Sequence, residues 1–192
     1  MNPITHFLGG WMVANACTLD RRERAIVTLA SVAPDIDGVG LVAEVLTRDT
    51  GHPLLWWSHY HHVFGHNLAF GLLVAGGSFL LATQRWKTAL LAFLSFHLHL
   101  FCDVIGSRGP DGYQWPIAYY YPFSDAWQWT WSGQWELHAW PNVVFTVVAL
   151  LVTFYLAWTR GYSPVELVSD SADRTFVETL RQRFPLTGYQ GP

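Results

Sequence analysis

The chain has 192 residues, of which 13% are charged and 51% are apolar, and its formal net charge is -3. Soluble domains carry about 25% charged residues, so this composition favours a membrane protein. The weak net charge and the lack of a basic stripe argue against nucleic acid as a partner. A chain of this length is expected to bury a substantial core in one main domain.

The first part of the chain predicts two short apolar helices, over residues 4–18 and 24–33. A proline ends the second helix, and a loop that contains Asp35 and Asp37 follows it. A further short helix is expected over residues 40–47. Neither of the first two helices is long enough to cross a bilayer alone.

Three longer apolar stretches cover residues 67–84, 88–105 and 143–159. At a rise of about 1.5 Å per residue, such a stretch nearly covers the hydrocarbon core of about 30 Å. This length lies at the threshold for membrane spans, so buried core helices of a soluble protein are the alternative. The sequence predicts an all-α, multi-helix, membrane-embedded bundle whose neighbouring helices are antiparallel.

A long, aromatic-rich loop over residues 107–140 is expected between the last two main helices. So many Trp and Tyr residues argue against disorder, and a loop of this length in a compact domain is usually functional. Two interpretations remain open. The aromatic side chains form a belt at the lipid headgroups, or they form a lid over an apolar cleft.

The division into domains follows from the change in character near residue 163. Residues 1–162 are expected to form the membrane-embedded domain, and residues 163–192 an amphipathic helical tail. Phe176, Leu180 and Phe184 share one helical face, so the tail helix is expected on the membrane surface or against the bundle. A solvated C-terminal helix is the alternative.

The alternating helix directions place candidate metal ligands at one pole of the bundle and basic residues at the other. The ligand pole contains His6, Asp35, Asp37, His61, His66, His99 and Asp103. The basic pole contains Arg21, Arg22, Arg24, Arg85, Lys87 and Arg160. By the positive-inside rule, the basic pole is expected in the cytoplasm and the ligand pole on the non-cytoplasmic side of a bacterial inner membrane.

His99 and Asp103 are the candidate ligands with the clearest spacing. They stand four residues apart on one helix, so both side chains can reach one ion. An ion pair that caps the helix is the alternative, but ionisable groups inside apolar segments are costly and usually functional. His97 lies about 200° round the helix from His99, so we assign it to packing or to support behind the ligands.

The remaining candidates lie in loops before the 67–84 stretch. Asp35 and Asp37 can chelate a cation and are candidate catalytic bases, although the same sequence also forms ordinary turns. His61, His62 and His66 belong to the densest group of imidazoles in the chain. Not all of them need bind metal, and His62 is assigned to support behind the ligands.

The ligand types restrict the metal. Mixed imidazole and carboxylate ligation suits zinc, manganese or iron rather than calcium or a thiolate site. Seven candidates exceed the four ligands of a tetrahedral zinc ion, so we expect one or two divalent ions, most readily zinc. Two-metal sites hold their ions about 3.5–4 Å apart and commonly serve phosphoester hydrolysis.

Five motifs together carry a resemblance to a known family. They are Thr5-His6-Phe7-Leu8-Gly9-Gly10, Ala33-Pro34-Asp35-Ile36-Asp37, His61-His62-Val63-Phe64-Gly65-His66-Asn67, His99-Leu100-Phe101-Cys102-Asp103 and Tyr121-Pro122-Phe123. Over roughly its first two thirds, the chain resembles the YdjM-like family of membrane-bound proteins described as metal-dependent hydrolases. The resemblance implies a multi-helix membrane protein with a His/Asp metal site at the seven positions of the ligand pole.

The third motif departs from the family pattern, which usually reads His-Arg, a few residues, then Thr-His-Ser. Here His62, Gly65 and Asn67 stand in place of the Arg, Thr and Ser. The two histidines keep their spacing, so metal binding remains implied. The missing Arg could have held a substrate phosphate, so the resemblance does not carry over a substrate class.

These observations predict a membrane-bound, metal-dependent hydrolase. Its substrate is expected to be a small-molecule or lipid-linked phosphoester, and membrane lipids are its other expected partners. One alternative is a non-enzymatic protein whose facing histidines hold haem. Another is a structural or regulatory membrane protein that binds metal only in order to fold. The oligomeric state does not follow from the sequence.

Overall fold

The computed structural model describes residues 1–109 and 112–185. Its helices are α1 (Pro3–Ala14), α2 (Arg21–Ala30), η1 (Pro34–Val39), α3 (Gly40–Thr47), α4 (Trp56–Tyr60), α5 (Leu68–Leu81), α6 (Arg85–Gly106), α7 (Trp140–Arg160), η2 (Pro164–Leu167) and α8 (Asp170–Arg183), where η marks a 3-10 helix. The described residues contain no β-strand and only two isolated bridges. The predicted all-α class is therefore confirmed.

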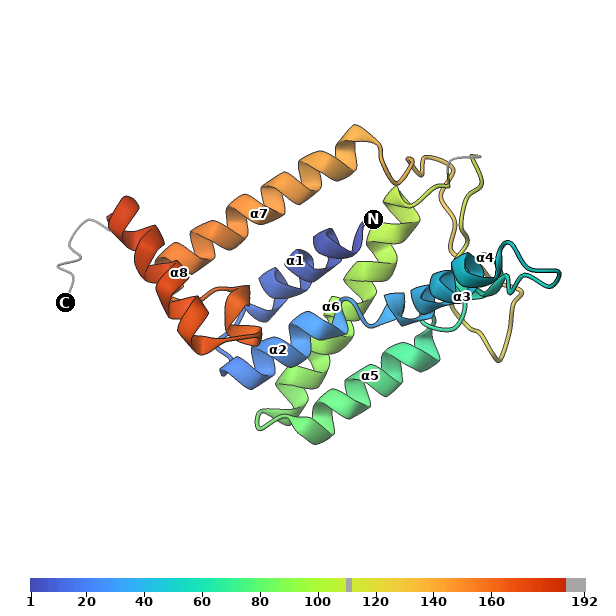
Figure 1. Cartoon of the computed structure of the whole chain (residues 1–192). Helices are drawn as coiled ribbons and strands as arrows, with labels where there is room; N and C mark the ends of the chain where they lie inside the picture. Colours follow the sequence, from blue (N-terminus) through green and yellow to red (C-terminus); the bar gives the residue numbers. More distant parts are fainter. Residues whose placement is uncertain (110–111, 186–192) are drawn as a thin grey trace.

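The long helix α6 is the centre of the bundle. It packs against α5, α2 and α1, and α7 packs against α1. Figure 1 shows α7, α1, α2 and α5 as a row of rods crossed by α6, with α3 and α4 at one end and α8 at the other. The pairs α1 and α2, and α5 and α6, run antiparallel, as the short turns between them predict, whereas α2 and the segment 34–47 meet at a bend of 60°.

The helix surfaces are reversed relative to those of a soluble protein. On α7 the buried side chains are Asn142, Ala149, Thr153 and Ala157, whereas most of its large apolar side chains are exposed. On α5 the buried residues are small as well, and four of its five leucines are exposed. Small residues at helix interfaces and large apolar residues outside are typical of membrane bundles. The soluble-core alternative is therefore wrong.

Two helices, α6 and α7, are long and apolar enough to cross a membrane, and α2 with the bent segment 34–47 is a candidate third span. The predicted span over residues 67–84 is wrong in its length, because α5 ends at Leu81. The carboxylate of Glu23 accepts hydrogen bonds from the backbone N and the side-chain Nε2 of Gln84. These bonds hold the chain in a turn where the apolar pattern alone predicts helix.

The other early helices also shift relative to their predicted bounds. Helix α1 stops at Ala14, since the side chain of Asn15 donates to the carbonyl of Trp11 and helps to end the helix. Helix α2 begins earlier than predicted, because Asp20 and Glu23 form a capping box. The segment that contains Asp35 and Asp37 is not an open loop but the 3-10 helix η1.

The basic pole is held together by polar contacts between its segments. The guanidinium of Arg24 forms a buried ion pair with Glu166 in η2, with nitrogen–oxygen distances of 2.6 and 2.7 Å. Lys87 donates to the carbonyl of Thr18 at 2.6 Å. Arg21 also contacts the carbonyl of Glu166. The first residues after α7 are thereby joined to the start of α2.

The tail helix α8 packs against α7, which agrees with one of the two predicted positions. Its buried side chains are Asp173 and Val177, and Phe184 is 62% exposed. Of the three residues predicted to share one face, Phe176 and Leu180 are partly buried and Phe184 is exposed, so the packed face is centred on Val177. Residues 186–192 of the predicted tail lie outside the described residues.

Candidate metal centre

Helix α6 brings His99 and Asp103 into the centre of the bundle. Both side chains are almost completely buried, and His99 Nε2 lies 2.9 Å from Asp103 Oδ2. The other ring nitrogen of His99, Nδ1, lies 2.6 Å from the backbone oxygen of Ser31. Because a carbonyl oxygen only accepts, Nδ1 carries the proton, and Nε2 is left with a lone pair directed toward Asp103.

His66 approaches the same point from the segment before α5. Its side chain is fully buried, and its Nε2 lies 3.1 Å from His99 Nε2 and 3.5 Å from Asp103 Oδ2. Its Nδ1 lies 3.0 Å from Asp37 Oδ2. Asn67 fixes this segment, since its side chain accepts from Phe70 N and caps α5.

Asp35, in the first turn of η1, supplies the fourth group. Its Oδ1 lies 3.6 Å from His99 Nε2. Its buried Oδ2 has no hydrogen-bond partner among the described residues. A buried carboxylate oxygen without a donor is costly, so this atom favours a cation nearby.

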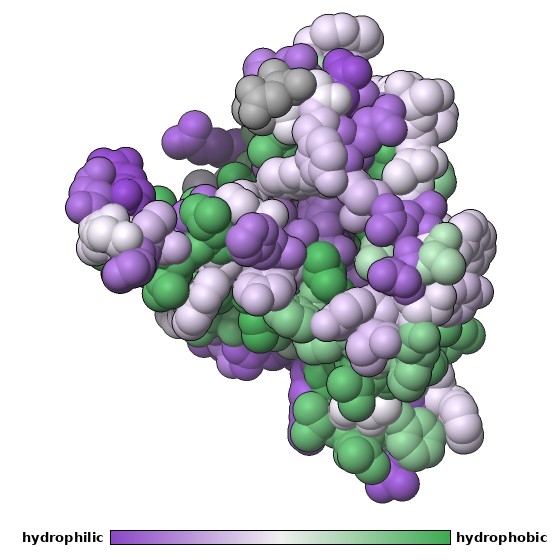
Figure 2. Space-filling model, turned by 90° about the vertical axis from the view of Figure 1, so that its right-hand side faces the viewer, coloured by the Kyte–Doolittle hydropathy of each residue, from purple (hydrophilic) through white to green (hydrophobic). Residues whose placement is uncertain are grey.

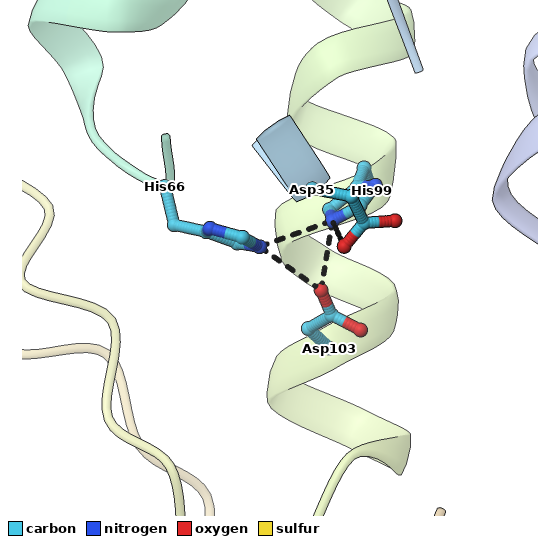
Figure 3. A group of neighbouring side chains, drawn as sticks. All are labelled: Asp35, His66, His99 and Asp103. Atoms are coloured by element: carbon cyan, nitrogen blue, oxygen red, sulfur yellow. Dashed lines mark hydrogen bonds and ion pairs between the residues drawn. The ribbon is translucent and has the colours of Figure 1, made fainter. Parts of the chain in front are cut away.

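One ligand atom from each of Asp35, His66, His99 and Asp103 lies within 4.8 Å of the others. Figure 3 shows the four side chains converging from η1, the segment before α5, and α6. Ligands of a tetrahedral zinc ion stand about 3.3 Å apart, given bond lengths of about 2.0–2.2 Å. Four of the six separations, between 2.9 and 3.6 Å, fit that requirement, and the two that join Asp35 to His66 and to Asp103 are at most 4.8 Å.

The electrostatics of His66 also fit a cation. Burial by itself lowers the pKa of this imidazole, but hydrogen bonds to Asp103 and Asp37, and their charges, outweigh burial and raise it to about 9. A ligating imidazole is neutral, so a divalent ion competes with the proton on Nε2. The negative charges of Asp37 and Asp103 stabilise a proton on His66, and they would stabilise a bound cation in the same way.

His6 lies on the other side of Asp103. Its Nε2 is 3.1 Å from Asp103 Oδ1, and its ring stacks on that of His99 with centroids 3.7 Å apart. Its Nε2 also lies 3.2 Å from the carbonyl of Met1, and the amino group of Met1 contacts Asp103 Oδ1. The two oxygens of Asp103 thus serve different neighbours, the four-residue cluster and His6.

Asp37 and His61 lie behind the cluster rather than in it. Asp37 accepts from the ring of His61 at 2.8 Å through Oδ1, and from the ring of His66 and the backbone N of Gly65 at 3.0 Å through Oδ2. Both oxygens are therefore occupied. A carboxylate in this position orients a ligating histidine and raises its basicity.

The two histidines assigned to support differ from each other. His62 is buried, with Nε2 3.9 Å from Asp103 Oδ2, and burial and neighbouring His66 lower its pKa well below the usual value. The backbone of His62 has a φ of 69°, which lies in the left-handed region that residues with a side chain seldom adopt. His97 instead contacts the carbonyl of Phe93 and the hydroxyl of Tyr119, each at 2.8 Å. It fastens the aromatic loop to α6.

A cavity of about 410 Å³ opens beside the cluster. Asp35 and Asp103 line it, together with His61, Trp57 and Trp115. Trp115 belongs to the long loop and contacts the ring of His61 edge-on, with centroids 5.2 Å apart. Other aromatic residues of the same loop, such as Phe123 at 86% exposure, lie on the surface. The loop therefore both walls the cavity and exposes aromatic side chains.

Three supporting groups gave no signal in the sequence. The backbone oxygen of Ser31 orients His99, and the hydroxyl of Ser31 donates to the carbonyl of His6. Gly65 lies so close to Pro34 that a Cβ on it would meet the Pro34 carbonyl oxygen at 2.0 Å. Each of these contacts involves a backbone atom, which residue types alone do not predict.

The exposed apolar helices and the buried His/Asp cluster define this chain as a helical membrane protein with a potential metal site. The family model of the YdjM inner membrane protein matches residues 1–169. The chain therefore belongs to the YdjM inner membrane protein family, as its motifs predicted. No curated protein and no solved structure matches the chain.

Proposed function

We propose that this protein is a metal-dependent hydrolase that acts on a phosphoester at the membrane surface. The observation that carries the proposal is the convergence of two imidazole Nε2 atoms and two carboxylates on one buried point beside a cavity. In this site Asp35, His66, His99 and Asp103 would hold a divalent ion, zinc in the first place and manganese or iron otherwise.

A second ion has fewer ligands available. Asp103 Oδ1 and His6 Nε2 lie 3.1 Å apart on the side of Asp103 that faces away from the cluster. The amino group of Met1 also contacts Asp103 Oδ1, so a cationic group already lies on this side, and the proposal rests on one ion with a second as the alternative.

The residues of the chain have distinct roles in the proposal. A bound divalent ion supplies a Lewis acid and lowers the pKa of a water ligand. Asp35 lines the cavity and is the better candidate for a general base, because both oxygens of Asp37 are occupied by His61 and His66. In the reaction, the oxygen of water bonds to phosphorus, the P–O bond to the alcohol breaks, and the alcohol takes the proton.

The site is proposed on the non-cytoplasmic side of the inner membrane. Six Lys and Arg residues of the basic pole lie at the helix ends opposite to the cluster, and the excess of such residues marks the cytoplasmic side. The haem alternative has less support, since Asp35 and Asp103 approach the same point as the two imidazoles.

The test is hydrolysis of a panel of phosphomonoesters and phosphodiesters by the purified protein in detergent. Chelation should abolish hydrolysis, and zinc or manganese should restore it. His99→Ala should remove activity, whereas His52→Ala, at an exposed histidine, should keep it. Folded, metal-loaded protein that hydrolyses no ester would refute the enzyme and favour a structural role for the metal.

A further inference from the structure

A second hollow, of about 940 Å³, lies between η1, α3, α4 and the first turn of α5. We call it the α3–α4 cleft. Apolar side chains make up most of its lining, among them Val42 and Leu46 from α3, Trp56 and Tyr60 from α4, and Phe70 from α5. Its volume is that of a site for a ligand with a large apolar part.

The α3–α4 cleft adjoins the candidate metal centre. Val39 lines both the cleft and the cavity beside the cluster, and it is the last residue of η1. Asp35, earlier in the same 3-10 helix, lines the cavity, whereas Asp37 lines the cleft and bonds to His66. A ligand that crosses Val39 would have one end beside the carboxylates and the other among the apolar side chains of α3 and α4.

The surroundings of the α3–α4 cleft favour an alkyl chain as its occupant. Helix α3 has no buried residue, and Leu46 on it is 76% exposed. Figure 2 shows hydrophobic side chains next to polar ones on the end of the molecule that carries α3 and α4. Because α3 belongs to the candidate third span, we place this surface against lipid, and a hydrocarbon chain can then enter the cleft directly.

We propose that the substrate is a long-chain alkyl phosphoester, whose phosphate reaches the His/Asp cluster while its chain lies in the α3–α4 cleft. This inference rests on the proposed hydrolase function. The cleft then provides affinity, because each buried methylene strengthens binding about four-fold. Hydrolysis adds the oxygen of water to phosphorus, breaks the P–O bond to the alcohol and protonates the alcohol, which stays in the membrane.

The experiment compares the protein in lipid nanodiscs with variants that fill or charge the cleft. Ala43→Trp fills it, and Leu46→Glu charges its rim at an exposed position that tolerates the change. Val45→Trp is the matched control, because Val45 lies on the same helix but does not line the cleft. The probes are dodecyl phosphate, ethyl phosphate and a dodecyl phosphate that carries a diazirine at the end of the chain.

In the wild type, the photolabel should attach within residues 36–46 and 56–70. Ala43→Trp and Leu46→Glu should each reduce this labelling and raise KM for dodecyl phosphate about ten-fold or more, the loss of a few buried methylenes. KM for ethyl phosphate should not change, and Val45→Trp should change neither measurement.

Three outcomes separate the two proposals. Equal effects of the cleft variants on both esters, or labelling spread evenly over α7, would overturn the alkyl-chain site while leaving the hydrolase intact. Labelling in the cleft without hydrolysis of any ester would refute the hydrolase and support the chain site. A wild type that is dimeric and becomes monomeric on Ala43→Trp, with labelling unchanged, would assign the cleft to a second copy and overturn the inference.

Discussion

At the scale of single residues, the candidate centre depends on atoms that orient the ligands. Asp37 and Ser31 each hold the Nδ1 of a histidine, so the Nε2 atoms of His66 and His99 face each other and the carboxylate of Asp103. Such contacts behind a histidine fix the orientation and the tautomer of its ring. Both Nε2 atoms are therefore available to one ion.

We expect Asp37→Ala to weaken zinc binding by about 10–100-fold, the usual cost of losing a carboxylate behind a ligating histidine. Zinc affinity is measured by titration against a competing chelator. Asp49→Ala is the control, because Asp49 is exposed and pairs only with neighbouring Arg48 among the described residues. Equal affinity of wild type and Asp37→Ala would contradict the orienting role.

The sequence predicted which residues lie near one another, but not which of them belong to the cluster and which orient its histidines. His99 and Asp103 follow from helical spacing alone. Asp35 and Asp37 are indistinguishable as letters, and only the 3-10 geometry of η1 separates the one beside the cluster from the one behind His66. The contact of Gly65 with Pro34 is a backbone approach with no sequence pattern of its own.

At the scale of elements, the ends of the helices decide where the ligands lie. The apolar pattern predicted the number and direction of the main helices, since hydrophobic runs and prolines mark them. It did not predict the early end of α5, because that end depends on Glu23, which is distant in sequence. It also missed the buried pair of Arg24 and Glu166, which joins η2 to α2.

Glu166→Ala should lower the free energy of unfolding by about 3–5 kcal/mol, because it leaves the buried guanidinium of Arg24 without its partner. The control, Asp170→Ala, removes an exposed pair with Arg21 and should change stability by about 0–1 kcal/mol. Unfolding in detergent micelles measures both variants. Equal losses would show that the buried pair does not fasten η2 to the bundle.

At the scale of the whole molecule, the outward leucines and valines and the inward small and polar residues describe a protein solvated by lipid. The positions of Lys and Arg predict the orientation of this bundle across the membrane. The basic pole lies at the helix ends opposite to the His/Asp cluster, so a cytoplasmic basic pole puts the cluster on the other side.

A reporter fused after Arg160 should therefore read cytoplasmic, and one inserted after Asp49, at the ligand pole, should read non-cytoplasmic. A reporter that fluoresces only in the cytoplasm, paired with one active only in the periplasm, makes the measurement. The reverse pattern would place the cluster in the cytoplasm and contradict the proposed orientation.

The central claim is that the imidazoles and carboxylates gathered by η1, α6 and the segment before α5 hold a metal ion. Elemental analysis of the protein purified without added metal tests this claim most directly. We expect at least one zinc, manganese or iron ion per chain, lost in the double variant His99→Ala and Asp103→Ala and retained in His97→Ala. Folded wild-type protein that contains no such metal, and takes up none on titration, would contradict the account.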